Sequence, residues 1–95
     1  FQIPVVILMP TGLDLKHYLS KGEWVYQPLI DKLEALNFKY YNLGNSIIDR
    51  LDGKDPCMLF NNCSAHFNAE GNKLISKCVF DYLKENVQPI NEVVF

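Results

Sequence analysis

The feature that most constrains the fold of this chain is an uninterrupted apolar run, Ile3 to Met9. Its residues are largely β-branched and do not alternate with polar positions, which is the pattern of a strand covered on both faces. Such strands belong mostly to parallel sheets, whose crossover helices pack on either side. Pro4 fits only the beginning of this strand, because proline cannot donate to a strand ladder. The run therefore predicts an α/β fold with a parallel sheet.

A helix and a second strand are expected next along the chain. Pro28 is compatible with the helix if it lies in the first turn, and Asn37 can end it. The stretch Phe38 to Leu43 then has the composition of a strand. The apolar positions that share one face of the predicted helix are Tyr26, Leu29, Ile30, Leu33 and Leu36. The order strand, helix, strand predicts a right-handed βαβ unit.

Shorter elements are expected in the connections. The loop Thr11 to Gly22 contains one predicted helical turn, and His17 within it is interpreted as a solvated loop residue. The spacing of Ile47, Ile48 and Leu51 predicts a short helix. Two apolar stretches are expected to pack against the domain: Met58-Leu59-Phe60, which anchors a loop or forms a small strand, and the tail Val93-Val94-Phe95.

Composition excludes several classes of partner. The net charge is −2, with 9 basic and 11 acidic residues spread along the chain without blocks. No cluster of Lys and Arg offers a footprint for nucleic acid or an anionic membrane surface. The longest apolar run is too short to span a bilayer. The sequence thus favours one small α/β domain, or part of one, with neither nucleic acid nor a membrane span.

The three cysteines leave two alternatives open. Cys57 and Cys63 are close enough in sequence to close a short disulfide, whereas Cys78 falls on the predicted buried face of a helix. We slightly favour three reduced thiols. No Cys-x-x-Cys pair or paired Cys/His spacing supports a zinc site, so no metal or other cofactor is expected.

A histidine lies just before the last predicted helix, Lys73 to Asn86. Asn68 is a good N-cap, because its side chain can accept hydrogen bonds from the free N–H groups of the first turn. His66 is therefore held just outside a helix N-terminus, where the positive end of the helix dipole favours the neutral imidazole that a general base requires. A lone histidine in such a loop is more often a surface or capping residue.

The block that begins at this histidine, His-Phe-Asn-Ala-Glu-Gly-Asn-Lys-Leu-Ile-Ser, resembles the last conserved block of the SGNH (GDSL-like) hydrolases. The stretch Pro4 to Thr11 is similar to a strand of that superfamily. The segments Pro28 to Leu36 and Tyr41 to Leu43 are similar to its next helix and strand end. The resemblance covers most of residues 3–86, in the family's order. It implies a flavodoxin-like, three-layer fold, of which this chain is the C-terminal portion.

The resemblance also implies acyl-ester chemistry. In this family a serine attacks an ester or accepts an acyl group, and the histidine takes up and returns the proton. His66 matches that catalytic histidine. Thr11, Asp14, Ser64 and Asn68 are possible accessory residues, because the loops after parallel strands share an edge with the starts of the following helices.

Two departures from the family pattern concern the other catalytic groups. The family usually places an aspartate three or two residues before the histidine, where this chain has Cys63 and Ser64. Asp49, Asp52 or Asp55 could replace it, a backbone carbonyl could serve instead, or the site is degenerate. The stretch from Gly44 to Ile47 imitates the family's Gly-Asp-Ser-Leu block, but it is in the wrong place. Ser46 in this stretch is interpreted as a turn or N-cap residue.

No other serine block is present, so the nucleophile is expected outside this sequence. A short two-stranded sheet also leaves strand edges bare. We therefore expect residues 1–95 to be a single partial domain that packs against the remainder of its domain or another chain. Its predicted function is to supply the histidine of an esterase or acyl transferase acting on an acyl ester or acetylated carbohydrate, and it is expected to be inactive alone. The alternative is a noncatalytic module of the same fold that binds carbohydrate or protein.

Overall fold

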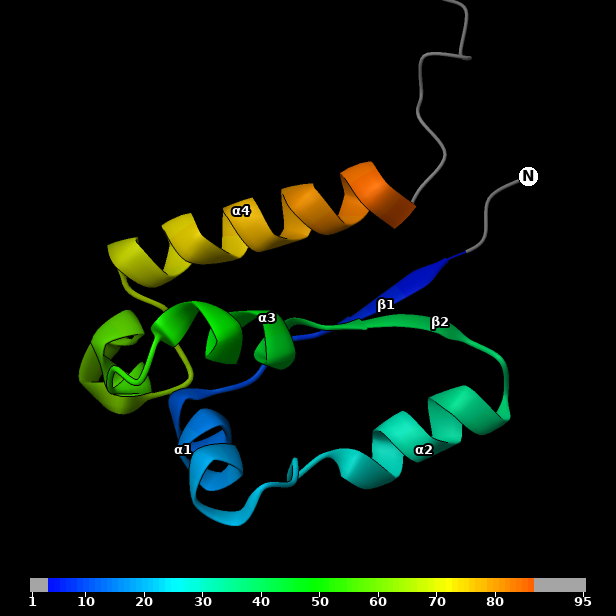
Figure 1. Ribbon diagram of the computed structural model, residues 1–95, viewed down its shortest axis with the longest axis horizontal. Helices are drawn as coiled ribbons and strands as arrows, with labels where there is room; N and C mark the ends of the chain where they lie inside the picture. The colour runs from blue at the N-terminus through cyan, green and yellow to red at the C-terminus, as the bar shows by residue number, and fades with distance from the viewer. Residues whose placement is uncertain (1–3, 87–95) are drawn as a thin grey trace, which may run out of the picture.

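The computed structural model describes residues 4–86, which form a mixed α/β fold (Figure 1). The strands pair in parallel, as the βαβ pattern predicted. The elements follow one another in the order β1 (Val5–Leu8), α1 (Gly12–Lys21), α2 (Gln27–Ala35), β2 (Lys39–Asn42), α3 (Leu43–Leu51), the short 3₁₀ helices η1 (Pro56–Leu59) and η2 (Asn61–Cys63), and α4 (Ala69–Asn86).

The sheet consists of β1 and β2, with Val5 opposite Lys39 and Leu8 opposite Asn42. It lies between α4 on one side and α2 on the other, which gives three layers (Figure 1). Stacking of the Tyr41 ring on Tyr82, with 4.2 Å between centroids, ties α4 to the sheet. Within residues 4–86 the outer edges of both strands carry no further strand.

Helix α1 is longer than the single turn expected in this connection. At its start Thr11 and Asp14 form a capping box: the Thr11 N–H donates to the Asp14 carboxylate (2.9 Å), and the Asp14 N–H donates to the Thr11 hydroxyl (3.1 Å). At its end Gly22 adopts a left-handed conformation and its N–H donates to the Tyr18 carbonyl. Because both ends are capped, His17 lies within a helix and not in a loop.

The remaining elements agree with the pattern in type and differ at their ends. Helix α2 has Pro28 in its first turn, as expected, and Asn37 follows it with a positive φ of 59°. Strand β2 is shorter than the stretch Phe38 to Leu43, because Leu43 already starts α3. The tail Val93 to Phe95 lies outside the described residues.

A single hydrophobic core joins the strands, the four α-helices and the first 3₁₀ helix. Leu15, Leu43 and Ile47 have no exposed surface. The other buried apolar side chains are Leu8, Trp24, Ile30, Leu33, Leu51, Leu59, Phe60 and Cys78. Helix α3 therefore contributes three buried side chains to the core, those of Leu43, Ile47 and Leu51.

Replacement of Ile47 by alanine tests this core. Ile47→Ala removes a fully buried side chain from α3, so we expect a loss of about 2–4 kcal/mol in the free energy of unfolding. Leu13→Ala in α1 is the control, because 67% of that side chain is exposed and its loss should cost about 0.5 kcal/mol or less. Urea unfolding followed by circular dichroism measures both, and equal effects of the two changes would contradict this core.

Candidate functional site

The predicted histidine lies in a folded loop between η1 and α4. Phe60 and Phe67 form an antiparallel bridge across this loop, and their rings lie 4.2 Å apart between centroids. The Asn61 N–H donates to the His66 carbonyl (2.9 Å), which closes the loop from within. Phe60 is buried, as expected for an anchor, although the surrounding residues form 3₁₀ turns rather than a strand.

Asn68 fixes the point where the loop enters α4. Its Oδ1 accepts a hydrogen bond from the Gly71 N–H (2.9 Å), which confirms the predicted N-cap. Its Nδ2 donates to the carbonyls of Met58 (2.8 Å) and Phe60 (3.3 Å). The same side chain therefore caps the helix and holds the preceding 3₁₀ turn. With this cap, α4 begins at Ala69, four residues before the predicted start of the helix at Lys73.

The cysteines differ from our preferred interpretation. Cys57 and Cys63 form a disulfide, with their Cα atoms 4.5 Å apart, so the expectation of three reduced thiols is wrong for this pair. The disulfide closes the loop before His66 and lies against the start of α1, where a Cβ on Gly12 would be 3.1 Å from the Cys63 sulfur. Cys78 is free and buried, as expected, and burial raises the pKa of its thiol and so disfavours the reactive thiolate.

His66 itself is exposed at the outside of this loop. Its backbone N–H donates to the Ser64 hydroxyl (3.2 Å), and its carbonyl accepts from Asn61. Within residues 4–86 no hydrogen bond or ion pair is formed by the imidazole ring, so Asp49, Asp52 and Asp55 do not orient it. The backbone of His66 is therefore fixed while its ring stays accessible.

The predicted accessory residues are brought to the same region by backbone contacts. The Gly12 N–H donates to the Ser64 carbonyl (3.3 Å), so the start of α1 adjoins the His66 loop as expected for the carboxyl edge of a parallel sheet. The Thr11 and Asp14 side chains are engaged in the capping box of α1, and Asn68 caps α4. Their participation in substrate binding stays a prediction.

Ser46 is neither a turn residue nor an N-cap. It lies inside α3, whose N-cap is Asn42, and its hydroxyl accepts a hydrogen bond from the Tyr41 hydroxyl (2.6 Å). Desolvation by burial raises the pKa of this tyrosine. A hydroxyl held inside a helix by a neutral phenol has no base beside it, so the structure offers no support for Ser46 as a nucleophile.

Metal ligation and membrane insertion are two other properties that bear on function. Residues 4–86 contain no group of three or more His, Cys, Asp or Glu side chains that could hold a metal ion. None of the helices in this part of the chain is long and apolar enough to cross a membrane.

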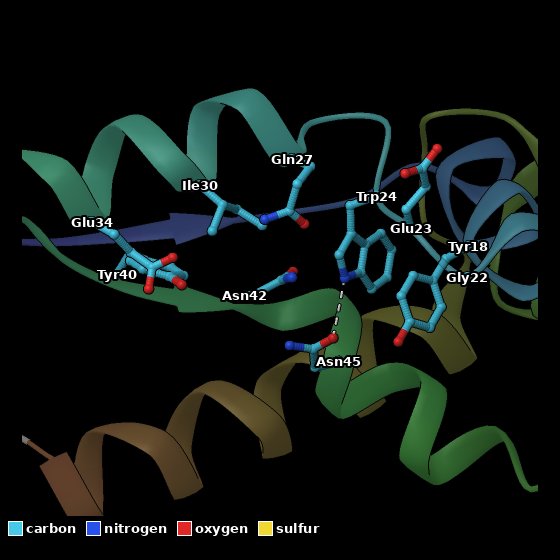
Figure 2. Close-up of a pocket in the computed structure, with 10 residues that line it drawn as sticks. All are labelled: Tyr18, Gly22, Glu23, Trp24, Gln27, Ile30, Glu34, Tyr40, Asn42 and Asn45. Carbon is cyan, nitrogen blue, oxygen red and sulfur yellow. Dashed lines mark hydrogen bonds between the residues drawn. The ribbon is translucent and has the colours of Figure 1, made fainter.

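A second candidate site was not anticipated from the sequence. A groove of about 410 Å³ opens between α2 and β2, and Trp24, Asn42 and Asn45 are among the residues that line it (Figure 2). Trp24 is buried, with 5% of its surface exposed. In the sequence, only the two amide residues near the end of β2, Asn42 and Asn45, could have indicated this groove. The same pair is equally compatible with a helix cap.

Comparisons of this chain with protein-family models, with curated proteins and with solved structures found no match. The resemblance to the SGNH hydrolases therefore depends on the quoted blocks of sequence.

The disulfide provides a direct test of the His66 loop. Alkylation of the unfolded, unreduced chain should label only Cys78, whereas all three cysteines should be labelled after reduction. Replacing both Cys57 and Cys63 by serine should lower the free energy of unfolding by about 2 kcal/mol, because the unfolded chain is no longer restricted by the short loop that the disulfide closes. Intact mass spectrometry and urea unfolding measure the two effects, and Cys78→Ser, which leaves the disulfide in place, is the alkylation control. Three labels without reduction would contradict the disulfide.

Proposed function

We propose that this chain is the C-terminal part of a flavodoxin-like SGNH-type domain and supplies His66 as the general base of a serine esterase or acyl transferase. The observation that carries the proposal is the exposed His66 imidazole on a loop with fixed backbone at the carboxyl edge of a parallel sheet. Ligands of open α/β sheets bind at this edge. The sequence block around His66 supplies the chemical class.

The His66 loop suits a base that acts on a group from elsewhere. The disulfide, the Asn61 bond and the Asn68 cap restrain the backbone on both sides of the histidine. A restrained backbone lowers the entropic cost of aligning the imidazole with a nucleophile. The ring nitrogens are free to accept a proton from a serine hydroxyl and to return it to the leaving group.

The serine would come from the remainder of the domain or from another chain. Both outer strand edges are unpaired within residues 4–86, although a sheet of this kind normally continues. Large apolar side chains are exposed beside it: Ile7 in β1 is 36% exposed, and Phe80 and Leu83 in α4 are 64% and 42% exposed. A covering segment would bury these side chains and bring its serine to the histidine. The proposed substrate is an acyl ester or an acetylated carbohydrate.

One observation favours a second candidate function. Within the described residues the imidazole has no carboxylate partner, and such a partner normally sets the tautomer of a catalytic histidine. A noncatalytic domain of the same fold, which binds carbohydrate or protein, needs no such partner.

The test is fluorophosphonate labelling of the longest natural polypeptide that contains this sequence. We expect labelling of one serine outside residues 1–95, because His66 activates that serine as a nucleophile. His66→Ala should lower the labelling rate at least about 100-fold. Intact mass measurement and peptide mapping identify the labelled residue.

His17→Ala is the matched control, because it removes the other histidine of the chain, which lies in α1. This variant should be labelled at the wild-type rate. Equal labelling of His66→Ala and wild type would overturn the role of His66, and no labelling of the wild type would favour the binding domain.

A further inference from the structure

The groove between α2 and β2 is lined by amide, carboxylate and aromatic side chains (Figure 2). Its volume of about 410 Å³ falls within the roughly 300–1,000 Å³ of small-molecule sites. The Asn42 and Asn45 amides lie beside the Trp24 indole, with Glu34 and Tyr40 at one end and Glu23 at the other (Figure 2). None of these residues belongs to the His66 loop.

The orientation of each amide is set by at least one neighbour that can only donate, the Gly44 N–H for Asn42 and the Trp24 indole N–H for Asn45. The Gly44 N–H (3.1 Å) and the Tyr26 hydroxyl (2.8 Å) both donate to Oδ1 of Asn42. The indole N–H of Trp24 donates to Oδ1 of Asn45 (3.2 Å). Since backbone and indole N–H groups cannot accept, each oxygen must face its donor and each NH₂ group must point the other way.

Asn42 is the unusual member of this pair, because only 7% of its surface is exposed. Within the described residues its Nδ2 donates to no protein group, and the same holds for Nδ2 of Asn45. In this part of the chain every fully buried side-chain nitrogen or oxygen has a hydrogen-bond partner. Because Nδ2 of Asn42 has no such partner, this atom is not fully buried and must reach solvent. It is a nearly buried donor that opens on the groove, and such donors are costly to leave unpaired.

The ionisable and aromatic groups of the lining complete the pattern. Glu23 and Glu34 are the charged side chains among the residues that line the groove, which include no Lys or Arg, so the two carboxylates provide acceptors. Trp24 is stacked between Tyr18 and Tyr26, with 4.2 and 5.1 Å between ring centroids, so its indole is held rigidly and both of its faces are covered. Tyr18 and Tyr40 are half-buried and add hydroxyl groups.

We propose that this groove is a binding site for a neutral mono- or disaccharide. Each sugar hydroxyl both donates and accepts, so it can pair an Asn42 or Asn45 donor with a Glu23 or Glu34 acceptor. The apolar side of a sugar ring can pack on the half-buried rings of Tyr18 and Tyr40, which line the groove. An organic cation would use the carboxylates and rings but would leave the nearly buried Asn42 donor without a partner. The groove therefore matches a polyhydroxylated ligand better than a cation.

This site does not depend on the role of His66. In an esterase it would hold a glycan near the sheet edge, and in a noncatalytic domain it would be the binding function itself. Failure of the serine labelling experiment therefore leaves the proposal standing, and absence of sugar binding leaves the histidine chemistry standing.

The experiment is an NMR titration of the isotopically labelled chain with cellobiose, xylobiose, N,N′-diacetylchitobiose and lactose. At least one sugar should shift the side-chain amide resonances of Asn42 and Asn45 and the indole resonance of Trp24. The dissociation constant is expected on the order of millimolar. Butylammonium is titrated in parallel as the cationic probe.

Asn45→Asp is the variant that separates the two ligand classes. It keeps the oxygen that accepts from Trp24 and replaces the NH₂ group by a carboxylate oxygen, near the start of α3, where negative charge is tolerated. Sugar binding should weaken about tenfold, because one donor is lost. A cation would instead bind more tightly.

Asn72→Asp makes the same change at an exposed position near the start of α4, away from the groove, and should leave sugar binding unchanged. Circular dichroism verifies that both variants are folded. The proposal is overturned if no sugar shifts these resonances, if butylammonium alone does so, or if Asn45→Asp binds sugar as tightly as Asn72→Asp.

Discussion

Parallel pairing of β1 with β2 is the constraint on which the rest of this structure depends. Parallel strands cannot be joined by a tight turn, so the chain must return along the sheet before β2 begins. The return contains α1, the Trp24 connection and α2. Both strands consequently end at the same edge, where the starts of α1 and α3 lie. The His66 loop joins them there through the bond from Gly12 to Ser64.

Local sequence patterns predicted most of the helices and strands. The β-branched run, the helix with Pro28 in its first turn and the Asn68 cap depend on neighbours in sequence, and each appears in the structure. Of the predicted apolar face of that helix, Ile30 and Leu33 are buried, whereas Leu29 and Leu36 are exposed. The coarse α/β class follows from their order. The length of α1 was missed because its stability comes from caps at both ends, and the hydrophobic pattern between them marks a single turn.

Features that depend on the three-dimensional path of the chain could not be predicted from local sequence patterns. Sequence separation permitted a bond between Cys57 and Cys63, but only the two 3₁₀ turns bring their Cα atoms within 4.5 Å. The orientation of the Asn42 and Asn45 amides depends on Tyr26 and Trp24, which donate to the amide oxygens from distant parts of the sequence, together with the nearby Gly44 N–H. A polar residue next to a helix start looks the same in sequence whether it only caps or also faces a groove.

The disulfide beside the start of α1 makes the conformation of the His66 loop dependent on the redox potential of its surroundings. Disulfides persist in secreted, periplasmic and lumenal settings and are reduced where glutathione and thioredoxin act. In a reducing compartment Cys57 and Cys63 would be separate thiols, and the loop would depend on its hydrogen bonds and on the Phe60–Phe67 bridge. The geometry described for His66 is thus the geometry of the oxidised chain.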